Sequence, residues 1–118
     1  MDGRPERVSY ELRIMSPAPI DLVAVRRLLL AVDGVEAVGD ELIWAGALVN
    51  AAFVLDQTEI GVGVTSGEAP TEDLRREFRA LLDVVSRVAA LVGAPVYDVQ
   101  LGRTLARDDD EAVRDFAG

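Results

Sequence analysis

The chain has 118 residues and a formal net charge of -9, and half of its residues are hydrophobic. This length suits one domain, and the acidic surface disfavours binding to nucleic acid or to an anionic membrane. The sequence contains no Cys, His or Lys, which excludes disulfides, thiolate or imidazole catalysis and Schiff-base chemistry. We therefore expect no metal site and no cofactor.

The domain is expected to span residues 1–118, with a flexible N-terminus over 1–6 and a C-terminal extension over 106–118. The polar N-terminus lacks the apolar run of a signal peptide. No apolar stretch has the length needed to cross a bilayer. The sequence therefore predicts a cytoplasmic protein that does not enter a membrane.

The first predicted element is a strand over residues 8–15. Val8, Tyr10, Leu12 and Ile14 alternate with polar residues, which is typical of a strand with one buried face. A helix is predicted next, over 19–32, because a proline suits the first turn of a helix and a glycine its end. Its apolar residues cover more than one side, so the second side is expected to pack within the chain or, alternatively, against another subunit.

Residues 35–50 form the least regular stretch of the sequence. Residues 41–44 resemble a short strand, and residues 45–48 either continue that strand, kink it or form a helical turn. Strand character returns over 49–56 and again over 59–65, with a tight connection between the two segments. These two segments predict an antiparallel hairpin.

A long amphipathic helix is predicted over residues 72–92. Its apolar residues recur at helical spacing and Gly93 follows its last turn, as expected of a helix packed on a core. A strand over 96–101 is expected next, with Tyr97, Val99 and Leu101 on its buried side. The acidic run 108–111 then begins a short C-terminal helix, where helix capping explains the carboxylates better than a calcium loop does.

This order of elements predicts an α+β fold of the ferredoxin-like βαββαβ type. We expect a four-stranded antiparallel sheet with two helices on one face, plus the short C-terminal helix. The other sheet face would then be open. Gly61 and Gly63 are unfavourable within a strand and suggest either a sharp twist or the close approach of another group to the backbone.

The open face is the predicted site for a ligand or a partner. The candidate residues are polar or glycine, and no catalytic residue is assigned among them: Glu11, Arg13, Gly61, Gly63, Asp98, Gln100 and Arg103. Three interpretations remain open. The face is solvated or packs on a second copy, it binds a small polar ligand whose acid group pairs with an arginine, or two of its carboxylates share acid and base roles.

We expect a non-catalytic protein-binding or regulatory module, of the immunity, antitoxin or adaptor type, that forms a homodimer and binds a basic protein. The acidic surface favours such a partner. The alternative is a small-molecule-binding or catalytic dimer of the α/β-barrel type that uses the open sheet face. The absence of His argues against the alternative, so enzymatic activity is not expected.

Overall fold

The computed structural model describes residues 8–67, 69–105 and 110–117, and the expected flexible segment 1–6 lies outside them. Seven strands and three helices follow in the order β1 (Val8–Met15), α1 (Leu22–Leu30), β2 (Val35–Val38), β3 (Glu41–Ala45), β4 (Val49–Leu55), β5 (Glu59–Ser66), α2 (Thr71–Val92), β6 (Val96–Asp98), β7 (Arg103–Thr104) and α3 (Asp110–Ala117).

The strands form one sheet in the order β2-β3-β4-β5-β1-β6-β7, and every neighbouring pair is antiparallel. The expected four-stranded ferredoxin-like plait with two helices is therefore wrong. The chain adds a strand pair, β2 and β3, beyond β4, and a short strand, β7, beyond β6. Residues 35–38 were not expected to form a strand. In the structure only one of the four is even partly buried, and a segment this short gives too few alternating positions to identify a strand.

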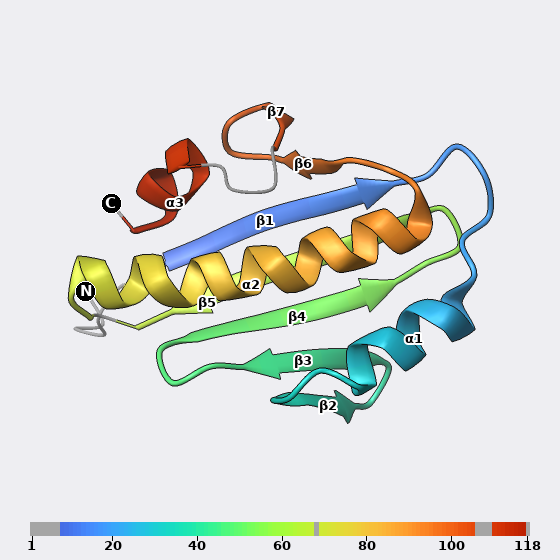
Figure 1. Cartoon of the computed structure of the whole chain (residues 1–118), viewed down its shortest axis with the longest axis horizontal. Helices are drawn as coiled ribbons and strands as arrows, with labels where there is room; N and C mark the ends of the chain where they lie inside the picture. Colours follow the sequence, from blue (N-terminus) through green and yellow to red (C-terminus); the bar gives the residue numbers. More distant parts are fainter. Residues whose placement is uncertain (1–7, 68, 106–109, 118) are drawn as a thin grey trace, which may run out of the picture.

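The helices gather on one side of the sheet, where α2 runs along the strands over β5, α1 lies over the ends of β3 and β4 beside β2, and α3 lies near the start of β1 (Figure 1). Side chains from this side of the strands pack against α2 in one continuous core, which includes Leu12, Phe53, Val62, Phe78 and Leu81. None of the three described helices lies over the opposite side of the sheet, which we call the open face (Figure 1).

Helix α1 begins later than expected, because Asp21 is its N-cap and accepts a hydrogen bond from the Ala24 N–H at 3.1 Å. Only Val25 and Leu29 of this helix are buried. Val23 and Leu30 on its outward side are 68% and 44% exposed. Packing within the described residues therefore leaves these two side chains of the second apolar side uncovered, and contact of this side with another subunit stays a prediction.

Helix α2 and the hairpin of β4 and β5 match the predicted segments closely. The predicted apolar stripe of α2 is buried from Leu74 to Ala89, and the helix ends at Gly93 in the left-handed conformation (φ 79°). Both segments could be predicted because their hydrophobic residues recur regularly over many positions.

The β3–β4 turn is held to α2 by Glu77. The carboxylate of Glu77 accepts hydrogen bonds from the backbone N–H groups of Leu48 (2.9 Å) and Val49 (3.0 Å). A Cβ atom at Gly46 would collide with this carboxylate and would lie 2.9 Å from the Val49 carbonyl oxygen. Position 46 therefore requires glycine, because the Glu77 carboxylate and the Val49 carbonyl oxygen lie too close for a larger residue.

We expect the Gly46→Ala variant to have a lower free energy of unfolding than the unmodified chain, by about 1–3 kcal/mol, because the added methyl overpacks the turn. The Glu77 carboxylate has little freedom to move aside, since it binds two backbone N–H groups. Urea denaturation followed by circular dichroism measures the change. A variant as stable as the unmodified chain would show that the turn relaxes freely.

Candidate functional site

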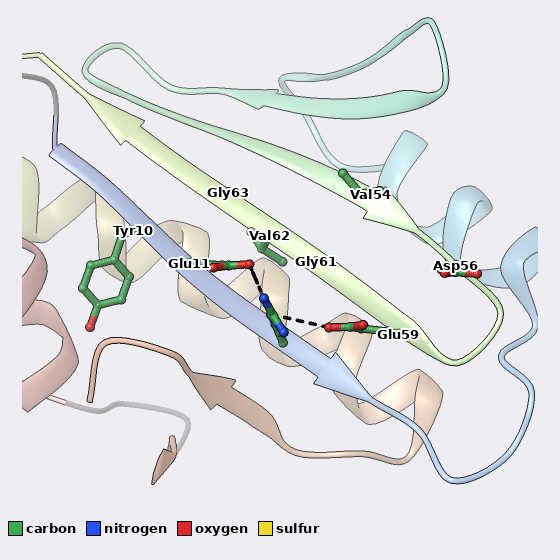
Figure 2. A pocket seen from close by; sticks show the side chains of 9 residues that line it. Tyr10, Glu11, Val54, Asp56, Glu59, Gly61, Val62 and Gly63 are labelled. Atoms are coloured by element: carbon green, nitrogen blue, oxygen red, sulfur yellow. Dashed lines mark hydrogen bonds and ion pairs between the residues drawn. The ribbon is translucent and has the colours of Figure 1, made fainter. Parts of the chain in front are cut away.

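The open face has a shallow depression of about 460 Å³ centred on β5. Its lining comes from β1, β4, β5 and the connection between β4 and β5. It includes Glu11, Arg13, Val54, Asp56, Glu59, Gly61 and Gly63. Figure 2 shows Gly61 and Gly63 on the strand between Glu11 on one side and Val54 on the other, with Glu59 and Asp56 toward the end of the hairpin.

Strand register explains why these residues meet. Glu11 pairs with Gly63 and Arg13 pairs with Gly61 across the β1–β5 ladder. Val54 pairs with Gly61 on the other side. Because neighbours across a ladder share a face, the two glycines lie in a row between side chains of β1 and β4.

Arg13 is held between two carboxylates. Its Nε and Nη2 donate to Glu11 Oε1 at 3.1 and 3.0 Å, and Nε lies 3.5 Å from Glu59 Oε1. The hydrogen bonds to Glu11, together with the charges of Glu11 and Glu59, raise the pKa of Arg13. The guanidinium therefore stays charged and already has anionic partners. This arrangement weakens the expectation that Arg13 pairs with the acid group of a ligand.

The depression carries a negative charge. Its lining contains the carboxylates of Glu11, Asp56 and Glu59 against the single guanidinium of Arg13, which gives a formal net charge of −2. Asp56 and Glu59 were not among the candidate residues. The alternation of β5 offers a signal for Glu59, since it shares the parity of Gly61 and Gly63, whereas Asp56 lies outside any strand and gives none.

Gly61 and Gly63 form the floor of the depression, and packing inside the molecule does not require glycine at either position. A Cβ atom at either Gly61 or Gly63 would meet no atom within 4 Å. Neither residue has a positive φ. A left-handed backbone conformation or tight internal packing therefore does not account for them, in contrast to Gly46. Glycine at these two positions leaves the peptide groups of β5 open to the close approach of another group.

Asp98 does not lie on the open face, contrary to expectation. It is fully buried on the helix side of the sheet, where its Oδ2 accepts a hydrogen bond from the Tyr10 hydroxyl and its Oδ1 accepts one from the Leu101 N–H at 2.9 Å. Strand β6 buries Val96 and Asp98 rather than the expected Tyr97, Val99 and Leu101. Shared acid and base roles for Glu11 and Asp98 are excluded because the sheet separates the two carboxylates.

Gln100 and Arg103 also lie apart from the depression. Gln100 follows the end of β6, and its side-chain amide pairs with the backbone of Glu11, accepting from its N–H and donating to its carbonyl oxygen at 3.0 Å. Arg103 lies in β7 and forms an ion pair with Glu111 of α3 at 3.2 Å. Both side chains therefore have structural roles, one extending the sheet and the other holding α3.

The described residues hold no group of three or more Asp or Glu side chains arranged to bind a metal ion. Among the described helices, none is long and apolar enough to cross a membrane. Comparisons of the chain with protein-family models, with curated proteins and with solved structures found no match.

Proposed function

We propose that this chain is a non-catalytic protein-binding module that binds a basic partner through its open sheet face. The observation that carries the proposal is the negatively charged depression over Gly61 and Gly63. The interior of the molecule gives no reason for glycine at either position. Charge complementarity speeds association and selects partners of opposite sign, and a formal net charge of -9 over the whole chain acts in the same direction.

The shape of the depression favours a protein partner over a small molecule. Pockets for small ligands enclose most of the ligand surface, whereas this depression lies open on a sheet face. It leaves most of a small ligand in water, but it fits a side chain that projects from a larger surface. A homodimer through this face is disfavoured, because it would bring two depressions of net charge −2 together.

Replacing the floor glycines is expected to stabilise the chain while removing binding. Gly61→Ala and Gly63→Ala should each raise the free energy of unfolding by about 0.5–1 kcal/mol, because alanine has less backbone entropy to lose in a strand. This is opposite in sign to the effect expected at Gly46. Urea denaturation measures both changes in parallel, and a loss of stability at Gly61 or Gly63 would show that the interior does require glycine there.

The test of function uses three versions of the tagged chain for capture from native lysate: the unmodified chain, a Gly61→Thr/Gly63→Thr variant and a Gly67→Thr control. Threonine suits a strand and fills the floor without adding an apolar patch. Gly67 also has open space around its Cβ position but lies outside the depression. Quantitative mass spectrometry compares the captured proteins, and light scattering gives the oligomeric state.

We expect a specific basic protein with the unmodified chain and the Gly67→Thr control, and its loss with the filled variant. Recovery of the same proteins with all three versions would contradict the use of this face. Repeated recovery of the bait alone would contradict the proposal as a whole.

A further inference from the structure

The depression has the dimensions and the walls of a trough for one long side chain. Neighbouring strands lie about 4.8 Å apart, so β1 and β4, which flank β5, are about 10 Å apart across the trough. Glu11 and Arg13 stand on the β1 side, and Val54, which is 50% exposed, stands on the β4 side. The carboxylates of Asp56 and Glu59 lie at the hairpin end (Figure 2).

The chain already places one guanidinium group on this face. The guanidinium of Arg13 lies at one wall and donates to Glu11 at 3.0 and 3.1 Å, with Glu59 at 3.5 Å. After this pairing the lining still carries a net charge of −2. A second cationic group therefore finds unneutralised carboxylate charge at the end of the trough.

We propose that the trough over Gly61 and Gly63 binds an arginine side chain of the protein partner. This inference rests on the proposed function and names the chemistry of its partner. The aliphatic part of the arginine lies against Val54, and the planar guanidinium lies flat on the peptide groups of the glycine floor, which no Cβ obstructs. Its N–H groups donate to the carboxylates of Asp56 and Glu59.

Arginine fits this trough better than lysine for two physical reasons. The guanidinium is planar and weakly hydrated, so it stacks on flat peptide groups, whereas an ammonium group keeps its water shell. The guanidinium also presents several N–H groups in a fixed fork that matches carboxylate oxygens. A second copy of this chain is a poorer occupant, because the surface that it would offer to the trough on an open-face contact is itself acidic.

The test measures binding of three peptides to the ¹⁵N-labelled chain by NMR: acetyl-Gly-Arg-Gly-amide, its lysine analogue and its citrulline analogue. Citrulline has nearly the shape of arginine but no charge. The backbone N–H groups of Gly61 and Gly63 report directly on the floor of the trough. We expect the arginine peptide to shift these two signals, the lysine peptide to bind several-fold more weakly and the citrulline peptide to leave them unchanged.

Variants locate the charge that binds the guanidinium. Glu59→Gln is expected to weaken arginine binding by about two- to fivefold, the range that an exposed ion pair gives. Glu72→Gln is the matched control, because it removes the same charge from an exposed position in the first turn of α2, away from the trough. The control should bind as the unmodified chain does.

The arginine inference would be overturned if the lysine or the citrulline peptide bound as tightly as the arginine peptide. It would also be overturned if the arginine peptide left the signals of Gly61 and Gly63 unchanged. The capture experiment decides the proposed function separately. If the captured partner is lost when the floor is filled but the glycine signals stay unchanged in the peptide titration, the proposed function is supported and the arginine inference is wrong. If the arginine peptide shifts the glycine signals but no partner is captured, arginine binding by the trough is supported and the proposed function is contradicted.

Discussion

The Asp98→Ala variant is expected to be less stable than the unmodified chain by about 2–4 kcal/mol. Asp98 is fully buried and accepts hydrogen bonds from the Tyr10 hydroxyl and the Leu101 N–H. Leaving the buried Tyr10 hydroxyl unsatisfied costs about 1–3 kcal/mol, the partly buried Leu101 N–H costs less because water replaces its acceptor, and the deleted atoms leave a small cavity. Urea denaturation measures the change, and a Tyr10→Phe variant with the double variant gives the coupling energy between the two side chains.

Glu11→Ala is the matched control for Asp98→Ala. Both carboxylates belong to the predicted site, but Glu11 pairs with Arg13 on the surface, where about half of each side chain is exposed. Exposed ion pairs contribute little to stability, so the Glu11 variant should unfold near the midpoint of the unmodified chain. Asp98→Ala should in turn keep the arginine-peptide shifts of Gly61 and Gly63, because Asp98 lies on the other side of the sheet. If the Asp98 variant were stable but no longer bound the peptide, Asp98 would have to take part in the binding site.

The sequence predicts the elements whose pattern is long. Eight residues of alternation in β1 and a 22-residue stripe in α2 each repeat their period several times. These elements, with the hairpin of β4 and β5, place Glu11, Arg13, Gly61 and Gly63 on one face. That part of the candidate site could therefore be inferred from the amino-acid sequence alone, because register follows from alternation once the strands pair.

The short strands could not be predicted in the same way. Strand β2 has four residues, three of them exposed, and β7 has two. Such segments are strands only because a neighbouring strand supplies their hydrogen bonds, and that pairing is not encoded in local periodicity. The prediction of a four-stranded plait was therefore wrong because it omitted strands at both edges of the sheet.

Strand β6 shows how a buried polar residue misleads a prediction. Alternation of Tyr97, Val99 and Leu101 indicated one face, and a one-residue slip moves every side chain to the other. The structure buries Asp98 because Tyr10, 88 positions earlier in the chain, donates a hydrogen bond to it. A buried carboxylate is tolerated only with such partners, and a single sequence does not show which residue provides them.

Phe116→Ala is expected to lower the free energy of unfolding by about 3–5 kcal/mol, the usual cost of removing a buried aromatic ring. Phe116 is 1% exposed. Its ring stacks on Phe78 with centroids 4.3 Å apart and meets Tyr10 edge-on at 5.7 Å. These ring contacts attach α3 to α2 and β1.

Urea denaturation measures the loss, and hydrogen exchange separates its two possible origins. If the cavity weakens the whole core, exchange rises throughout α2 and β1, whereas detachment of α3 raises exchange in α3 alone. Val23→Ala is the control, because Val23 is 68% exposed and its removal should change little. A Phe116 variant as stable as this control would show that α3 does not depend on its ring. Since the aromatic cluster lies on the helix side, the shifts of Gly61 and Gly63 by the arginine peptide should persist in any Phe116 variant that remains folded.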